Sequence, residues 1–421
     1  MDNIAGTKSR LTWAVHISVA FLVLLWLFPT VGLFVSSFRT ADQISSSGWW
    51  AALFPTEQAI QLRTGGGDAA VQENGLYVVT GNLLTDEDGP GAEAVISTFG
   101  VSSRDIAAFS AGETAEFGDG ETLLVEADGT YRYTSVEEPG RRGQRVFVTA
   151  ETPPDFTLNN YQTILFSGSG QDNMAKAFFN TLTVTIPATI IPIVVAAFAA
   201  YALAWMDFPG RALLIALVVA LLVVPLQLAL IPLLTLHGEI AESVVAFLGT
   251  GDPDSPRKFA EVNALGRLLG FGPGDDVSPK GYVGVWMAHT GFGLPLAIYL
   301  LRNYMVGLPR DIIENAKVDG ATDFQIFTKI ILPLSFPALA SFAIFQFLWT
   351  WNDLLVAKVF LIDSTGSTTV MTNQIVELLG TRGGNWEILA TAAFVSIAVP
   401  LVVFFAMQRY LVRGLLAGSV K

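Results

Sequence analysis

Six long apolar runs constrain the fold of this chain more than any other feature. Each run reaches the ~20 residues that a helix needs to cross a hydrocarbon core about 30 Å thick. The runs lie at residues 12–36, 177–205, 211–236, 282–302, 336–360 and 388–411. With 52% hydrophobic and only 14% charged residues, the chain is unlike an ordinary soluble domain. We therefore predict an all-α polytopic membrane protein with six transmembrane helices.

The first apolar run is expected to remain in the protein as a helix. Lys8 and Arg10 precede it, but the run is longer than the core of a secretory signal peptide and has no evident A-x-A cleavage site. Lysine and arginine near helix ends in short loops favour the inner side of a membrane. With both termini in the cytoplasm, such residues are about twice as numerous in the inner loops as in the outer loops at 237–281 and 361–387, although Arg39 and Lys176 lie against this bias.

Residues 37–172 form a long segment between the first two runs. Within it, residues 40–172 contain 20 acidic and 6 basic residues, so this segment carries the acidity of the chain, whose net charge is −13, and argues against nucleic acid as a partner. Strand-like stretches occur at 75–84, 121–135 and 144–151, and Asp128-Gly129 is a hairpin signal. We predict a small, acidic, mostly-β domain on the outer side of the membrane.

The predicted organisation has three parts. Residues 1–36 are the cytoplasmic N-terminus and first transmembrane helix, residues 37–172 are the inserted extracytoplasmic domain, and residues 173–421 hold the other five transmembrane helices. Within the last part, residues 237–281 are an outer loop, with a short helix expected at 256–269. Residues 303–335 are an inner loop.

Sequence signals for enzyme chemistry are missing. There are no cysteines, which excludes disulfides and thiolate metal sites. The phosphate-binding pattern GxxxxGK[ST], HExxH and GxSxG do not occur. The three histidines are far apart in sequence. We expect a chain that is not an enzyme and binds no metal or cofactor of its own.

The inner loop has the pattern of two short helices joined at a glycine. Pro309 suits the first turn of a helix, and Gly320 suits its C-terminal end. Thr322 and Gln325 have the spacing of a capping box, so a second helix should begin there and end at Pro333.

An apolar stripe is expected on the second of these helices, formed by Phe324, Phe327 and Ile331. The residues leave two interpretations of the inner loop open. The loop either lies on the membrane or under the bundle, or it is a knob that fits a groove on a cytoplasmic partner.

The inner loop resembles the EAA loop of permease subunits of bacterial ABC importers. That family has E-A-A, three residues, glycine, nine residues and I-x-L-P. This chain has Glu314-Asn315-Ala316, Gly320, and Ile330 to Pro333 at the same spacing, and it departs only at Asn315. The stretches 178–190, 292–321, 350–361 and 408–421 are similar to carbohydrate permeases of the maltose class. The long insert and residues 373–394 are most like the α-glucoside transport permeases.

The resemblance implies the type I ABC importer permease fold, in the bacterial inner membrane. It implies a heterodimer with a second homologous permease, a dimer of ATP-binding subunits that hold ATP and Mg, and a periplasmic sugar-binding protein. Each permease would form half of the translocation path, here for α-glucosides such as maltose, sucrose or trehalose. A permease for another oligosaccharide or a polyol, or a membrane-anchored sensor, remains as an alternative.

The resemblance also implies sites of contact with the ATP-binding subunits. The coupling residues would be Glu314, Ala316, Asp319, Gly320, Ala321, Ile330, Leu332 and Pro333. We expect residues 314–321 to dock on the ATPase and residues 322–334 to brace the loop against its own bundle. Gly414, Gly418 and Lys421 match the C-terminal tail that reaches the ATPase in similar permeases; the alternative is a frayed chain end.

A polar stripe in the run at 336–360 is a candidate substrate path. Offsets of four and three residues would put Gln346, Thr350 and Asp353 on one helix face, flanked by Trp349 and Trp351. Asn352 is a further candidate for the same path. Such a stripe suits sugar hydroxyls and ring faces. The alternatives are an ordinary aromatic belt at the membrane boundary and a contact with the partner permease.

Overall fold

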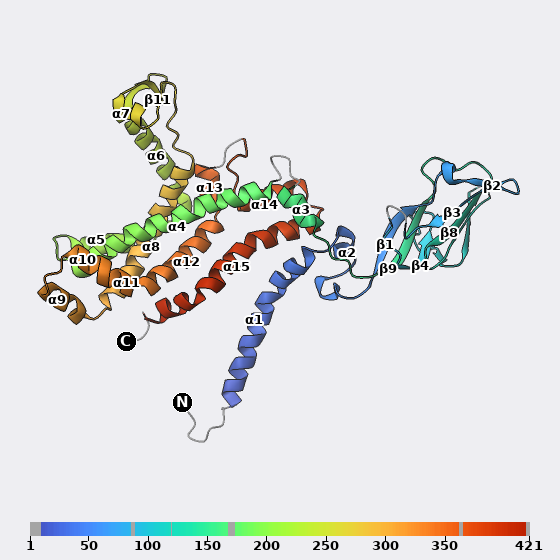
Figure 1. Cartoon of the computed structure of the whole chain (residues 1–421), viewed down its shortest axis with the longest axis horizontal. Helices are drawn as coiled ribbons and strands as arrows, with labels where there is room; N and C mark the ends of the chain where they lie inside the picture. The colour runs from blue at the N-terminus through green and yellow to red at the C-terminus, as the bar shows by residue number, and fades with distance from the viewer. Residues whose placement is uncertain (1–9, 86–88, 119, 167–172, 362–364, 418–421) are drawn as a thin grey trace. The chain divides into compact units, whose positions relative to one another are not determined.

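The computed structural model describes residues 10–85, 89–118, 120–166, 173–361 and 365–417, with the backbone alone for residues 10 and 411–417 (Figure 1). The chain divides into two compact units. The insert unit comprises Met1–Thr163 and Arg382–Phe394, and the core unit comprises Ile164–Thr381 and Val395–Lys421. Helices α3 (Asn159–Phe166) and α15 (Trp386–Ala417) cross the boundary between them.

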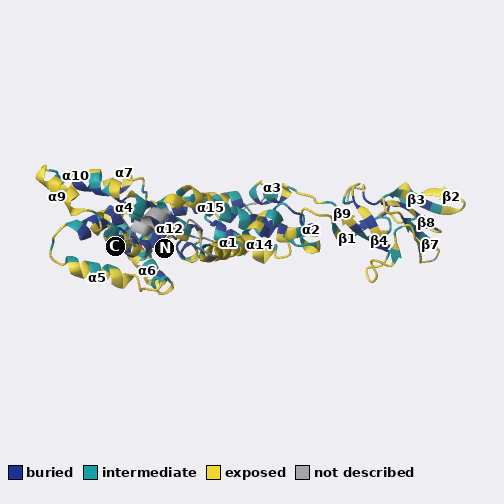
Figure 2. Ribbon diagram, turned by 90° about the horizontal axis from the view of Figure 1, so that it is seen from below, coloured by how far each residue is buried: buried dark blue, intermediate teal, exposed yellow. Residues whose placement is uncertain are grey.

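The insert unit starts with helix α1 (Arg10–Ser36), which is followed by α2 (Ala41–Ser46) and a short 3-10 turn, η1 (Trp49–Ala51). Only 6% of the most apolar 18-residue stretch of α1 is buried, and Figure 2 shows most of this helix as exposed. A long apolar helix with so little protein around it is suited to lipid contact.

The strands of the insert unit form two antiparallel sheets. They are β1 (Thr56–Arg63), β2 (Val71–Glu73), β3 (Leu76–Asn82), β4 (Val95–Gly100), β5 (Phe109–Ser110), β6 (Thr114–Phe117), β7 (Glu121–Val125), β8 (Thr130–Ser135) and β9 (Arg145–Thr152), with the 3-10 turn η2 (Gly67–Ala69) after β1. One sheet has the order β1-β9-β4-β5 and the other β2-β3-β8-β7-β6. Side chains from both sheets share one core, including Phe99, Leu123 and Val148, so the sheets pack face to face.

The three stretches expected to be strands are strands in this sandwich. The turn between β7 and β8 is at Asp128-Gly129, as its sequence indicates. Gly129 has φ +83°, and the Thr130 N–H donates to Asp128 Oδ1 at 2.9 Å. A glycine is suited to this position because a side chain disfavours positive φ.

The core unit is mainly helical. Its elements are α4 (Met174–Trp205), α5 (Arg211–Leu221), α6 (Leu226–Leu248), β10 (Gly249–Asp252), β11 (Ser255–Val262), α7 (Ala264–Leu268), α8 (Tyr282–Val306), α9 (Arg310–Val318), α10 (Asp323–Ile326), η3 (Phe327–Ile331), α11 (Leu332–Leu334), α12 (Phe336–Trp351), α13 (Leu355–Phe360) and α14 (Met371–Thr381). Helix α4 packs along α8 and α12. It buries small residues, among them Ala188, Ala196 and Ala200, which let helix backbones approach closely.

The described residues contain five helices long and apolar enough to cross a membrane, or six if one bent pair counts as a span. These are Leu11–Ser36, Met174–Trp205, Leu226–Leu248, Tyr282–Val306 and Trp386–Tyr410, with the bent pair Asp323–Leu334 and Phe336–Trp351 at 69°. The run expected to be continuous at 211–236 is broken between α5 and α6, because Pro225 caps α6 and lacks the N–H that a continuous helix needs.

The segment expected to be an outer loop at 237–281 also differs from expectation. Helix α6 continues to Leu248, and an antiparallel hairpin of β10 and β11 follows it. The helix expected at 256–269 is wrong for its first half, since only α7 is helical there. Phe259 and Val262 of β11 are buried against α6, and this tertiary packing outweighs the local helix signal.

Candidate functional site

The first candidate site is the elbow, residues 310–334. Helix α9 follows Pro309 and ends before Gly320, whose φ is +82°. The Ala321 N–H donates to Ala316 O at 3.0 Å across this turn. The Thr322 side chain then caps α10 in a reciprocal capping box with Gln325, as the spacing predicted. The two halves of the elbow are therefore joined by a defined turn rather than a loose loop.

One face of the elbow is packed into the helical bundle. Ile313, Ile326, Phe327 and Ile331 are buried in a cluster with side chains of α4 and α8. The ring of Phe327 lies 4.7 Å from the ring of Phe198 on α4. Ala316, Ala321 and Leu332 pack at the margin of the same cluster. Movement of the elbow would therefore be transmitted directly to α4 and α8.

The opposite face of the elbow is exposed. Glu314, Asp319 and Gly320 lie on it, and the apolar side chains of Val318 and Phe324 are 86% and 65% exposed. The expectation that Phe324 shares a buried stripe with Phe327 and Ile331 is wrong. Ile326 takes the inward position in α10 instead, so Phe324 faces outward with the residues expected to dock.

The second half of the elbow passes through Pro333 instead of ending there. A π-helical turn, η3, precedes the proline, and the helix continues as α11 to Leu334. Proline removes one backbone donor and its ring crowds the carbonyl four residues earlier, here that of Lys329. A wider π turn relieves this crowding. Ile330 is half-buried and Pro333 is exposed. The chain then bends by 69° into α12.

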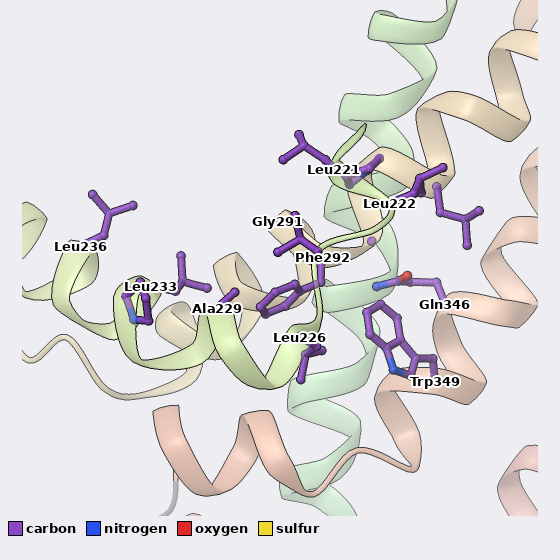
Figure 3. Close-up of a pocket in the computed structure, with 15 residues that line it drawn as sticks. Leu221, Leu222, Leu226, Ala229, Leu233, Leu236, Gly291, Phe292, Gln346 and Trp349 are labelled. Atoms are coloured by element: carbon purple, nitrogen blue, oxygen red, sulfur yellow. The ribbon is translucent and has the colours of Figure 1, made fainter. Parts of the chain in front are cut away.

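The second candidate site is a cavity of about 620 Å³ in the core unit (Figure 3). Its lining comes from the α5–α6 connection, α6, α8 and α12, and is almost entirely apolar. The lining residues are Leu221, Leu222, Val224, Leu226, Ala229, Pro232, Leu233, Leu236, Gly291, Phe292, Gly293, Pro295, Leu296, Gln346 and Trp349. Figure 3 shows the side chains of Gln346 and Trp349 extending from α12 toward the other lining residues.

Gln346 is the polar side chain of this lining. Its Nε2 donates to the backbone oxygen of Ala188 on α4 at 3.1 Å, which fixes the amide where α4, α8 and α12 meet. Gly293 on α8 makes room for it, because a Cβ at position 293 would lie 2.6 Å from Gln346 Oε1. The ring of Trp349 meets that of His289 edge-to-face at 5.8 Å. The cavity therefore offers one held amide and the aromatic rings of Phe292 and Trp349.

The other residues expected on the substrate path lie elsewhere. The Thr350 hydroxyl is buried and donates to Gln346 O at 2.7 Å within its own helix. Asn352 is exposed, with its Nδ2 donating to Leu348 O. Helix α12 ends at Trp351, so Asp353 does not share its face. The Asp353 carboxylate instead accepts the Ala357 N–H at the start of α13, and it lies 3.6 Å from His289 Nε2.

The α5–α6 contribution to the cavity was missed from the sequence. The residues 221–226 that line it were read as the middle of one helix. Pro225 is the signal that could have indicated the break.

The tail residues can be placed only in part. Gly414 lies in α15, of which the backbone alone is described there, and Gly418 and Lys421 lie outside the described residues. No group of three or more histidine, aspartate and glutamate side chains among the described residues could hold a metal ion.

Comparison with known proteins shows to which family the chain is similar. The family described as binding-protein-dependent transport system inner membrane component matches residues 171–416. The alpha-glucoside transport system permease protein of Rhizobium meliloti is 56% identical over 98% of this chain and 98% of its own length. The osmoprotective compounds uptake permease protein of Synechocystis sp. is 51% identical over 63% of this chain and 76% of its own length.

Among solved structures, a chain of a bacterial ABC transporter involved in the import of the acidic polysaccharide alginate matches with a TM-score of 0.44. It is 18% identical and covers 62% of this chain and 81% of that one. The family match covers more than half of the chain, and the Rhizobium relative matches almost all of it. This chain therefore belongs to the inner membrane components of binding-protein-dependent transport systems.

Proposed function

We propose that this chain is the transmembrane permease subunit of a binding-protein-dependent sugar importer, driven by ATP hydrolysis on separate subunits. The family supports the transport role, and the near full-length similarity to an alpha-glucoside permease supports the substrate class. The proposed substrates are α-glucosides such as maltose, sucrose or trehalose. ATP and Mg would be bound by the ATP-binding subunits, so this chain performs no chemistry itself.

The observation that carries the coupling role is the two-faced elbow. Its inner face is buried against α4 and α8, and its outer face exposes Val318 and Phe324. Apolar knobs of this kind fit grooves on partner proteins. Glu314 and Asp319 flank them and would pair with basic groups on the ATPase. When the ATPase dimer closes on ATP, its movement would reach the bundle through Phe327 and Ile331.

The cavity is the proposed part of the translocation path in this chain. Ligand sites are mostly apolar with a few placed polar groups. The Trp349 ring would contact the apolar face of a pyranose, and the Gln346 amide would hydrogen-bond a hydroxyl. Since α5 and α6 are separated by a break beside the cavity, their relative movement would open and close it, as in transporters built on broken helices.

The remaining assembly follows from the same proposal. A second homologous permease would complete the path, an ATP-binding dimer would sit below the elbow, and a periplasmic binding protein would deliver sugar. Six spans result when the bent pair counts as one, with both termini cytoplasmic and residues 37–172 periplasmic. The C-terminal tail with Gly414, Gly418 and Lys421 would reach the ATPase subunits.

The test is reconstitution. The complex that co-purifies with this chain from native membranes is placed in proteoliposomes, with the binding protein outside and ATP inside. We expect uptake of labelled maltose, sucrose or trehalose that requires both ATP and the binding protein. Equal uptake without ATP would contradict the proposal.

A second candidate is import of a different solute by the same architecture. The Synechocystis relative favours this candidate, because that protein is named for the uptake of osmoprotective compounds. The same proteoliposomes distinguish the two. If the second candidate is right, the proteoliposomes should take up labelled osmoprotective polyols, and unlabelled α-glucosides should not reduce that uptake.

A further inference from the structure

The chain turns back along α1 after leaving it. Trp49 of η1 packs on Gly32 of α1, where a Cβ would lie 2.7 Å from the Trp49 Nε1. The Phe28 ring lies 4.6 Å from the Trp49 ring and 6.3 Å from the Trp50 ring. Segment 48–54 therefore lies beside the last turns of α1 instead of continuing away from its end.

The position of these contacts along α1 sets their depth. At 1.5 Å per residue, Phe28 lies about 12 Å before the end of α1 at Ser36, and Gly32 about 6 Å before it. The apolar stretch Leu11–Ser36 has 26 residues, whereas a hydrocarbon core needs only ~20. A core centred on the stretch would extend to about residue 33. Phe28 and Gly32 then lie within it, and Trp49 reaches the same level.

Segment 48–54 has the composition and backbone of a membrane-boundary element. It reads GWWAALF and has no charged residue. Trp50, Leu53 and Phe54 are 67%, 76% and 66% exposed, although they are large and apolar. Three successive backbone hydrogen bonds close the turn, from Ala51 to Gly48, Ala52 to Trp49 and Phe54 to Ala51. These bonds satisfy three backbone donors of the segment internally, which lowers the cost of placing it near lipid.

A polar clamp holds this turn-back in place. The buried Arg39 guanidinium donates to Ser47 O at 3.0 Å and to Gln43 O, so it closes residues 39–47 into a compact loop. Asn160, after the last strand of the sandwich, donates to the backbone oxygens of Ser37 and Arg39 at 3.0 and 2.9 Å. The two chain segments that lead to the sandwich are thus fastened to each other at the end of α1.

We propose that Trp50, Leu53 and Phe54 form a lipid anchor that inserts into the membrane boundary on the side of the β-sandwich. The occupant of this surface is lipid because it continues the exposed side of α1, at the level where α1 is still within the apolar core. Tryptophan is suited to this depth, since Trp and Tyr collect at membrane interfaces, and Leu53 and Phe54 add apolar surface beside it. The anchor and the Arg39 clamp together fix the base of the sandwich to the bilayer.

The absence of cysteine makes this proposal directly testable. The full chain with Leu53→Cys is labelled with a nitroxide and placed in phosphatidylethanolamine–phosphatidylglycerol nanodiscs. Collision rates with oxygen, which concentrates in lipid, and with a water-soluble nickel chelate then report depth. Leu53 is mostly exposed, so the substitution should not disturb packing. Phe54→Cys repeats the measurement at a neighbouring site.

The matched controls are Phe21→Cys in the middle of α1 and Val136→Cys in the turn after β8, both exposed. We expect an oxygen-to-nickel ratio at position 53 several-fold above that at 136 and approaching that at 21. A ratio equal to that at 136 would place the segment in water. Low collision rates with both reagents at 53 and 54 would mean that protein covers the surface. Either result overturns the lipid anchor.

Discussion

At position 293 the lack of a side chain decides how α8 meets α12. The Gln346 amide occupies the space that a Cβ at Gly293 would need, and its hydrogen bond to Ala188 O ties α12 to α4. A polar group held this way between three helices can present its other atoms to a ligand without reorganising. Gly291 lines the same cavity from the same helix, but a Cβ there would meet nothing within 4 Å.

This pair of glycines gives a matched test of the cavity. Gly293→Ala should displace the Gln346 amide and destabilise the protein by about 1–3 kcal/mol through overpacking. Sugar uptake should fall more than membrane abundance. Gly291→Ala should leave the Gln346 amide in place and should not destabilise the protein, since its Cβ meets nothing within 4 Å and alanine favours a helix. Thermal unfolding in detergent and uptake in proteoliposomes measure the two effects. Similar unfolding temperatures and uptake rates for the two variants would show that transport does not depend on the position of the Gln346 amide.

Among the elements, the elbow shows how much local sequence can determine. The capping box of Thr322 with Gln325 and the positive φ of Gly320 both follow from residues close in the chain. For that reason both could be predicted, as could the β7–β8 turn at Asp128-Gly129. These features depend on side chains that bond their own backbone neighbours or on a residue without a Cβ.

Features that depend on distant packing could not be predicted in the same way. The exposure of Phe324 results from Ile326 taking the inward position beside α4 and α8. The β10–β11 hairpin exists because Phe259 is buried on α6. For the cavity, the sequence indicated Gln346 and Trp349. Their partners on α5, α6 and α8 come from segments 50 or more residues away in the chain.

The stability of the elbow turn should depend on its cap. Thr322→Ala removes the oxygen that accepts the Gln325 N–H and should cost about 0.5–2 kcal/mol of local stability. Backbone amides of residues 323–326 should then exchange hydrogen faster in the assembled complex. Thr328→Ala is the control, because its hydroxyl only donates to Phe324 O within the same segment. Equal hydrogen-exchange rates for these amides in the two variants would exclude a capping role for Thr322.

On the scale of the whole molecule, the arrangement pairs a β-sandwich insert with a helical core in one chain. The Rhizobium alpha-glucoside permease matches 98% of this chain, so the similarity extends through most of the insert. The Synechocystis permease matches only 63% of it. The family match itself begins at residue 171, so it does not include the sandwich. We expect it on the side of the membrane opposite the elbow.

Single cysteines test this sidedness, because the natural chain has none. Glu138→Cys in the insert and Lys317→Cys in the elbow are both at exposed positions. A membrane-impermeant maleimide should label position 138 in intact spheroplasts and position 317 only after permeabilisation. Labelling of both from the same side would contradict the proposed topology.

The coupling role of the elbow is the central claim, and sugar-stimulated ATP hydrolysis by the assembled complex tests it most directly. Proline cannot adopt the φ of +82° at position 320, so Gly320→Pro should break the turn between α9 and α10. Gly75→Pro, at another exposed positive-φ turn in the insert, is the control for a broken turn elsewhere. We predict that Gly320→Pro inserts and assembles normally but loses stimulation by sugar and binding protein, whereas Gly75→Pro retains it. Full stimulation with Gly320→Pro would contradict the claim.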